Sequence, residues 1–276
     1  MHLVIQGPLL ADDDLRQLAQ LAGARRIERL ASGAGRLIGA RQQPGIAEYC
    51  ARAKLDFGFI PEERKLADMK LLAIDMDSTL ISIECIDEIA DMAGVKTEVS
   101  AITAAAMRGE IDYTGSLRQR VGLLQGLDEG ALARVYDERL RLSPGAETML
   151  AAMQRAGVKT LLVSGGFRFY TERLKTRLGL DYSISNTLEV EHGRLTGRVV
   201  GDIVDAEAKA AKLRAVRDEL GIEEKQIIAI GDGANDLAMM AEAGVSIAYR
   251  AKELARGKAR YALDHAGLDG VLNLFA

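Results

Sequence analysis

Three uninterrupted apolar runs constrain the fold of this chain more than any other feature of its sequence. They are KLLAIDMD at residues 70–77, KTLLVSGG at 159–166 and QIIAIGDGAND at 226–236. A strand that is apolar at nearly every position is buried on both faces, as in a parallel sheet. Segments with helical spacing precede the second and third runs, at residues 145–157 and 206–221. This alternation of strand and helix predicts an α/β fold with a doubly wound parallel sheet.

Between the first and second runs, about residues 82–143 show helical spacing and no clear strand pattern. The stretch is too long for one crossover, so we expect a helical cap inserted above the carboxyl edge of the sheet. After the second run, residues 182–201 alternate in polarity around a His-Gly pair, which predicts a strand and a hairpin.

The first part of the chain has a different pattern. Its apolar segments follow the order strand, helix, strand, strand, helix, strand, which is typical of a ferredoxin-like α+β unit. Residues 61–70 are polar and are interpreted as a linker. We therefore predict a small domain at 1–66 and a larger one at 67–276.

Composition excludes several classes of function. The 276 residues are 48% hydrophobic with a net charge of −4, enough for a sizeable core, and no basic run tracks a nucleic-acid backbone. No apolar run reaches the roughly 18 residues that a membrane span needs. The N-terminus is too short and acidic for a signal peptide, and the two cysteines form no metal or disulfide pattern. We expect a cytoplasmic protein that binds neither nucleic acid nor membrane.

Carboxylates gather where two of the apolar runs end. Asp75 and Asp77 leave the same face of an extended strand, and Asp232 and Asp236 end another run. Taken alone, the first pair fits equally well a solvated strand end, with Asp77 or Ser78 capping the next helix. Because ligands bind beyond the carboxyl ends of parallel strands, the four acids together predict a site of oxygen ligands suited to Mg²⁺.

The remaining run ends in groups that suit an anion. Ser164 offers a hydroxyl, Gly165 and Gly166 let the backbone approach a ligand, and a helical segment follows at once. Lys209 adds a positive charge, although a lone lysine is more often solvated surface and a Gly-Gly turn is common. Together with the acids, these groups favour phosphoryl transfer through an aspartyl-phosphate.

Four ordered motifs resemble those of the haloacid dehalogenase superfamily over residues 70–276. They are DMDSTLI, SGG, a downstream lysine and GDGAND. The resemblance implies Asp75 as nucleophile and Asp77 as acid/base. It also implies Mg²⁺ held by the Asp75 and Asp232 side chains and the Asp77 carbonyl, with Asp236 as a support or an additional ligand. The implied phosphate contacts are Thr79, Ser164, Gly165 and Lys209, with Asn235 ordering the lysine or the phosphate.

Finer segments resemble the phosphoserine phosphatases of that superfamily. These are DSTLISIECIDEIA at 77–90, MRGEIDYTGSLRQRVGLL at 107–124 and VSGGF at 163–167. The resemblance implies Mg²⁺-dependent hydrolysis of O-phosphoserine to serine and phosphate, the last step of serine biosynthesis. Glu84 would meet the substrate ammonium and Arg120 its carboxylate, with Met107 and Tyr113 on the apolar side of the pocket. Many members have Phe where Tyr113 stands, so the role of its hydroxyl is open.

Other interpretations compete with this one. Without the resemblance, Glu84 is a surface residue, and Arg120 lies with Arg118 on a solvated helix face. An enzyme that moves the phosphoryl group to another acceptor, or that hydrolyses another small phosphomonoester, would carry the same motifs. An amino-acid sensor on an inactive domain is a third candidate, which the intact catalytic set argues against. The N-terminal unit resembles ACT modules in element order, and such modules often bind amino acids and pair into homodimers.

Overall fold

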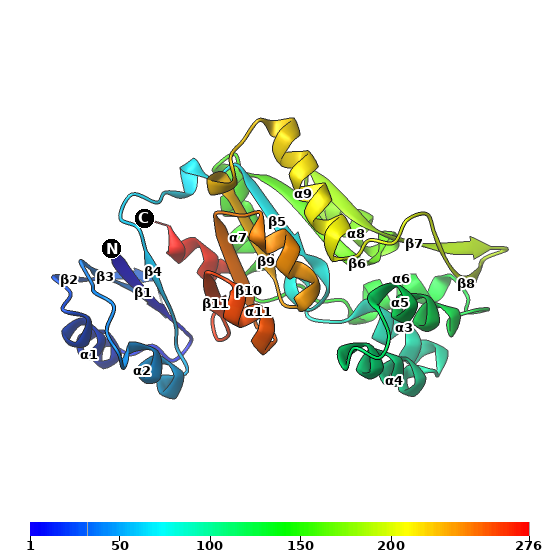
Figure 1. The fold of residues 1–276 in the computed structure, drawn as a ribbon, viewed down its shortest axis with the longest axis horizontal. Coiled ribbons are helices and arrows are strands. Elements are labelled where there is room, and N and C mark those ends of the chain that lie inside the picture. Colours follow the sequence, from blue (N-terminus) through cyan, green and yellow to red (C-terminus); the bar gives the residue numbers. More distant parts are fainter. Residues whose placement is uncertain (32, 276) are drawn as a thin grey trace.

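The computed structural model describes residues 1–31 and 33–275, and within these ranges the strands form two sheets (Figure 1). The smaller sheet belongs to the N-terminal unit and the larger one to the rest of the chain. The predicted fold class is confirmed: a mostly parallel α/β sheet follows a small α+β unit.

The N-terminal unit has the ferredoxin-like order of elements that its sequence pattern predicts. The strand order is β2-β3-β1-β4, and each neighbouring pair is antiparallel. Apolar residues from the sheet and both helices form its own core, in which Leu3, Leu18 and Cys50 are fully buried. The elements are β1 (His2–Gln6), α1 (Asp12–Ala22), β2 (Arg26–Ala31), β3 (Ala34–Ile38), α2 (Ile46–Ala53) and β4 (Asp56–Ile60).

The larger sheet has the strand order β11-β10-β9-β5-β6-β7-β8. Neighbours from β11 to β7 pair in parallel, whereas β7 and β8 form an antiparallel hairpin. The hairpin turns at His192 and Gly193, which both have positive φ angles (51° and 74°), as a two-residue turn of this kind requires. The strands are β5 (Leu71–Asp75), β6 (Lys159–Phe167), β7 (Tyr182–Glu191), β8 (Arg194–Val200), β9 (Ile227–Gly231), β10 (Val245–Tyr249) and β11 (Tyr261–Leu263).

Helices cover both faces of this sheet, and this explains why its central strands are apolar at nearly every position. Along β5, Leu71 and Ala73 face the core that α9 completes, whereas Leu72 and Ile74 face the core that α7 and α8 complete. All five residues of β5 are buried. The surrounding helices are α7 (Ala146–Arg155), α8 (Arg168–Leu178), α9 (Ala206–Leu220), α10 (Leu237–Ala241) and α11 (Glu253–Lys258).

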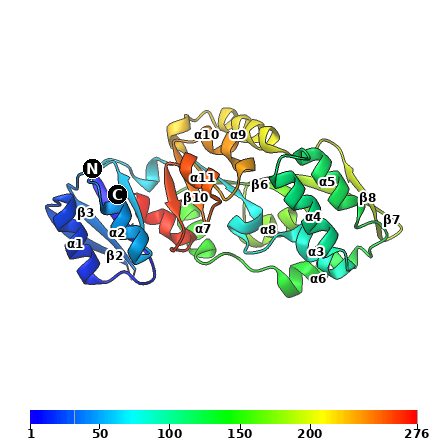
Figure 2. The ribbon, with the colours of Figure 1, turned by 60° about the horizontal axis from the view of Figure 1, so that its bottom comes forward.

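A group of helices is inserted between β5 and β6, in the region where the sequence predicts a cap. It comprises α3 (Cys85–Ala93), α4 (Lys96–Met107), α5 (Tyr113–Gly122), α6 (Gly130–Arg134) and the turn η3 (Val135–Arg139). Figures 1 and 2 both place this group beside the β7–β8 hairpin. Backbone bonds join the two parts: Gly126 donates to Leu195 at 2.8 Å, and Glu129 donates to Gly193 at 2.9 Å. The cap is therefore anchored at its hairpin end.

The N-terminal unit packs against the last segment of the chain. The buried Asp56 carboxylate accepts backbone N–H bonds from Asp264, His265 and Ala266 at 2.8–3.0 Å. Tyr261 on β11 donates to the Phe59 carbonyl at 3.1 Å. The polar segment 61–70 contains the short turn η1 (Leu66–Asp68), so it is more ordered than a plain linker. The domain boundary at residue 66 stays a prediction.

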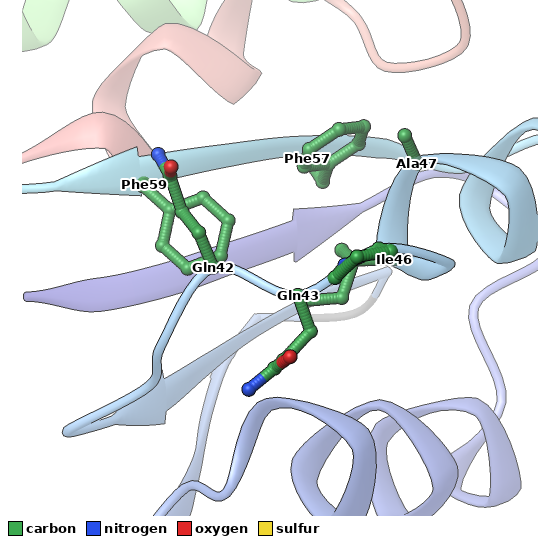
Figure 3. A pocket seen from close by; sticks show the side chains of 7 residues that line it. Gln42, Gln43, Ile46, Ala47, Phe57 and Phe59 are labelled. Carbon is green, nitrogen blue, oxygen red and sulfur yellow. The ribbon is translucent and has the colours of Figure 1, made fainter.

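A hollow of about 400 Å³ lies on the N-terminal unit, away from the acids that the sequence singled out. Figure 3 shows Phe57 and Phe59 of β4 lining it together with Gln42, Gln43 and Ile46. These lining side chains carry no charge. Among the described residues, no helix has both the length and the apolar character that crossing a membrane requires.

Candidate active site

The carboxyl ends of three neighbouring strands meet at one edge of the larger sheet. Because β5 pairs in parallel with β6 on one side and β9 on the other, Asp75, Ser164 and Asp232 emerge beside one another. Asp75 is the last residue of β5 and lies opposite Val163 of β6. The short 3₁₀ turn η5 (Ala234–Asp236) then carries Asp236 back toward this edge.

Lys209 of α9 links two of the predicted acids in a buried network. Its Nζ donates to Asp75 Oδ1 at 2.5 Å and to Asp236 Oδ1 at 2.8 Å, and all three side chains are at most 5% exposed. Burial alone would lower the pKa of Lys209, but the charges of Asp75 and Asp236 outweigh it and raise that pKa. The lysine is therefore an ammonium group inside the protein, and not the solvated surface residue that its sequence context allowed.

The acids outnumber the positive charge that neutralises them. Oxygens of Asp75, Asp232 and Asp236 lie within 4.8 Å of one another. Burial, followed by the charge of Asp236, raises the pKa of Asp75 and raises that of Asp232 to about 6. One ammonium cannot balance three such carboxylates, so the residues fit a hard cation with oxygen ligands.

Asp236 is already engaged on both of its oxygens. Oδ1 accepts from Lys209, and Oδ2 accepts the backbone N–H groups of Asp232 and Gly233, both at 3.1 Å. Asp236 is thus linked to Asp75 through Lys209 and to Asp232 through the backbone N–H of that residue.

Asp77 follows β5 in an irregular turn, where Ser78 has a left-handed φ of 56°. The turn directs the Asp77 carboxylate between two elements: Oδ1 accepts the Cys85 N–H at 2.8 Å, and Oδ2 lies 3.3 Å from the Ser164 hydroxyl. Burial, followed by repulsion from Glu84, raises the pKa of Asp77 to about 7. Near neutral pH this carboxyl group reaches both protonation states, as a general acid that later acts as a base requires.

Thr79 and the turn at Ser164–Gly166 contribute further polar groups to the candidate site. The Thr79 hydroxyl is fully buried and has no hydrogen-bond partner among the described residues. Gly166 donates its N–H to the Ser164 hydroxyl at 2.8 Å, and a Cβ at Gly166 would lie 2.5 Å from Asp77 Oδ2. A buried hydroxyl without a partner costs about 1–3 kcal/mol, so an acceptor such as a phosphate oxygen suits this position.

The residues predicted to recognise the rest of a substrate come from the cap side of the edge. Glu84 precedes α3 and accepts a hydrogen bond from the Ser78 hydroxyl at 2.7 Å. Its negative charge contributes to raising the pKa of Asp77 and that of Asp232. Arg120 is half-buried on α5, where its Nε donates to the Ser116 carbonyl at 3.3 Å.

Tyr113 begins α5, and its hydroxyl donates to the Gly165 carbonyl at 3.1 Å. Burial raises the pKa of Tyr113 to about 12, so the hydroxyl keeps its proton near neutral pH. The hydroxyl that the sequence left open is thus bonded to the glycine turn, and the contact of Tyr113 with substrate stays a prediction.

Two predicted residues are not drawn into this network. Met107 ends α4 and is 69% exposed. The Asn235 side chain folds toward Gly233, where a Cβ would lie 2.3 Å from Asn235 Oδ1. Their roles in substrate binding stay predictions.

Asn186 on β7 is a residue that sequence reasoning missed. Its buried Nδ2 donates to the Gly165 carbonyl at 2.8 Å, and its Oδ1 accepts the Val204 N–H at 2.8 Å, just before α9. It thus joins the glycine turn to the segment that leads to Lys209. A single asparagine in the middle of a strand is the signal that could have revealed it, because such a position disfavours asparagine.

Both parts of the chain match a known family model. Residues 72–241 match the family model of haloacid dehalogenase-like hydrolases. Residues 3–46 match a family described as a domain of unknown function, so the resemblance to ACT modules is not confirmed.

Curated relatives and solved structures agree with the first match. The chain is 57% identical over 215 residues to a phosphoserine phosphatase from Polaromonas sp., covering 76% of this chain and 91% of that one. It is 48% identical over 224 residues to one from Haemophilus influenzae, covering 81% and 69%.

Solved structures resemble nearly the whole chain. The structure of a probable phosphoserine phosphatase from Vibrio cholerae has a TM-score of 0.87 at 36% identity, covering 99% of this chain and 86% of that one. A HAD family hydrolase from Salmonella enterica serovar Typhi has a TM-score of 0.90 at 33% identity, covering 99% and 97%. The N-terminal unit is therefore part of what these proteins share.

Proposed function

Since the chain belongs to the haloacid dehalogenase-like hydrolases and, within them, to the phosphoserine phosphatases, we propose that it hydrolyses O-phosphoserine to serine and phosphate with bound Mg²⁺. This reaction is the last step of serine biosynthesis. In this proposal residues 67–276 carry the chemistry, and the cap at about 82–143 covers the substrate.

One observation carries the proposal most directly. A buried ammonium, Lys209, lies between Asp75 and Asp236 at the edge where the unpaired Thr79 hydroxyl and the Ser164 hydroxyl also lie. A purely structural ion pair would not explain the additional acids or the unpaired Thr79 hydroxyl. A phosphate bound against a carboxylate nucleophile needs both kinds of group.

The first step forms a covalent intermediate. The Asp75 carboxylate attacks phosphorus, the bond from phosphorus to the serine oxygen breaks, and Asp77 donates a proton to that leaving oxygen. Lys209, Thr79 and the turn at Ser164 and Gly165 hold the phosphoryl oxygens.

The second step releases phosphate. Asp77, now a carboxylate, takes a proton from water, and the water oxygen attacks phosphorus while the bond to Asp75 breaks. Mg²⁺ bound by Asp75, Asp232 and the Asp77 carbonyl would supply charge neutralisation and orientation of the phosphoryl group. Asp236 supports these ligands, because both of its oxygens already accept hydrogen bonds.

Recognition of serine rests on two charges of opposite sign. Glu84 faces the ammonium group of the substrate, and the guanidinium of Arg120 takes its carboxylate. Met107 completes the apolar side of the pocket, and Asn235 orders the lysine or the phosphate.

The test is phosphate release from O-phosphoserine, measured for the wild type with Mg²⁺, with excess EDTA, and for Asp75→Asn with Mg²⁺. We expect release only in the first case. Release that survives both EDTA and the substitution would overturn the proposal. Adding an alcohol such as homoserine separates hydrolysis from transfer, because a transferase would yield a phosphorylated acceptor in place of free phosphate.

A further inference from the structure

The carbonyl oxygen of Gly165 receives hydrogen bonds from two sides of the site. Asn186 approaches from the sheet at 2.8 Å, and the Tyr113 hydroxyl approaches from the inserted helices at 3.1 Å. The Asn186 side chain is buried and also bonded to Val204, so its half of the arrangement is fixed by the core. The hydrogen bond from Tyr113 is the one that the cap contributes.

The turn is shaped for this contact. A Cβ added at Gly165 would lie 2.2 Å from the Tyr113 hydroxyl oxygen, so only glycine lets the tyrosine approach. The same peptide unit continues into Gly166, whose N–H points at the Ser164 hydroxyl 2.8 Å away. Holding the Gly165 carbonyl on one side therefore sets the direction of the Gly166 N–H on the other.

Tyr113 itself is placed by the start of its helix. Asp112 caps α5, with Oδ1 accepting the Gly115 N–H at 2.6 Å. The far end of this part of the cap is bonded to the hairpin through Gly126 and Leu195. Tyr113 thus contacts the glycine turn at the opposite end of a segment that the hairpin anchors.

We propose that Tyr113 is a positioning residue: when the cap lies over the site, it holds the Gly165–Gly166 peptide so that the Gly166 N–H orients the Ser164 hydroxyl for phosphate. The inference rests on the proposed function only in that phosphate binds at this edge. Through this contact, cap closure favours phosphate binding and phosphate binding favours cap closure, because both select the same orientation of the Gly165–Gly166 peptide. Where a phenylalanine replaces the tyrosine, the ring remains but this link is lost.

The test compares Tyr113→Phe with the wild type, using inorganic phosphate and Mg²⁺ as the probe. Tyr182→Phe is the matched control, because that hydroxyl bonds Glu219 at the surface, 2.8 Å away. We expect the dissociation constant of phosphate, measured by titration calorimetry, to rise about fivefold to tenfold in Tyr113→Phe, the worth of roughly one hydrogen bond. Hydrogen exchange should show that phosphate protects the amides of 113–122 in the wild type and in the control, and not in Tyr113→Phe.

A double-substitution cycle gives a second, independent readout. Gly165→Ala should weaken phosphate binding far less when Tyr113 is already phenylalanine, because the oxygen that its Cβ would strike is gone. An unchanged dissociation constant of phosphate with unchanged protection in Tyr113→Phe, or strictly additive effects in the cycle, would overturn the inference. Because these readouts need no turnover, they stand apart from the phosphoserine assay, and failure of that assay would leave them interpretable.

Discussion

Arg118 and Arg120 lie on the same helix but differ in their exposure to solvent. They lie two residues apart on α5, so they point to different faces, and the structure leaves Arg118 exposed while Arg120 is half-buried. The sequence alone allowed both to be a solvated pair. The position of Arg120 on the helix that begins with Tyr113 supports its proposed role toward the substrate carboxylate.

Arg120→Ala should therefore cost substrate discrimination more than general activity. We expect kcat/KM for O-phosphoserine to fall about 10- to 100-fold, the worth of a hydrogen bond to a charged group. A phosphate ester without a carboxylate should lose much less, and Arg118→Ala should change neither. Steady-state kinetics on both substrates decides this, and equal losses on the two would remove Arg120 from recognition.

The meeting of site residues at one sheet edge was predictable for a simple reason. Asp75, Ser164 and Asp232 each end an apolar run, and parallel strands bring such ends to one edge. Asn186 was not predictable in this way, because its partners Gly165 and Val204 are backbone groups that no sequence pattern marks.

At the scale of elements, Asp181 joins the beginnings of β6 and β7. Its carboxylate accepts bonds from Lys159 Nζ at 2.7 Å, from the Thr160 N–H at 2.9 Å and from the Thr160 hydroxyl at 3.0 Å. Burial alone would raise the pKa of Asp181, but the bonds from Lys159 and Thr160 outweigh it and lower the pKa. The ionised form therefore stabilises the folded chain.

Asp181→Asn should lower stability in a pH-dependent way. A lowered folded pKa adds stability above the unfolded value of roughly 3.9, and that stability disappears as the pH falls through the folded value. We expect a loss of about 1 kcal/mol in the free energy of unfolding at pH 7. The loss should approach zero at pH values below the folded-state pKa of Asp181. Urea unfolding at pH 7 and at lower pH measures it. The exposed Asp202→Asn is the control, and a loss in Asp181→Asn that does not change with pH would contradict the argument.

The elements themselves were largely predictable, because hydrophobic periodicity follows burial. The β5, β6 and β9 strands and the cap helices lie where the pattern placed them. The strands β10 and β11 were not identified, and β11 is only three residues long and carries little periodicity.

At the scale of the whole molecule, the N-terminal unit is docked and not merely tethered. Asp56 lies about 200 residues from its partners Asp264–Ala266 in sequence, yet its buried carboxylate accepts their N–H groups. Burial raises the pKa of Asp56, whereas those N–H groups oppose the shift. No local pattern marks such a contact, which explains why the sequence suggested only a linker.

Asp56→Ala should loosen this docking. Three half-buried N–H groups would lose their acceptor, so we expect the free energy of unfolding to fall by about 2 kcal/mol. Hydrogen exchange should become faster in β4 and in residues 264–266. The exposed Asp68→Ala is the matched control, and a change below roughly 0.5 kcal/mol in Asp56→Ala would show that the contact does not hold the two parts together.

The central claim is that Asp75 carries the phosphoryl group during turnover. Rapid acid quenching of the enzyme with Mg²⁺ and ³²P-labelled O-phosphoserine, followed by peptide mapping, tests it directly. The account predicts hydroxylamine-sensitive label on the peptide that contains Asp75, absent in Asp75→Asn. Label on another residue, or full turnover by Asp75→Asn, would contradict it.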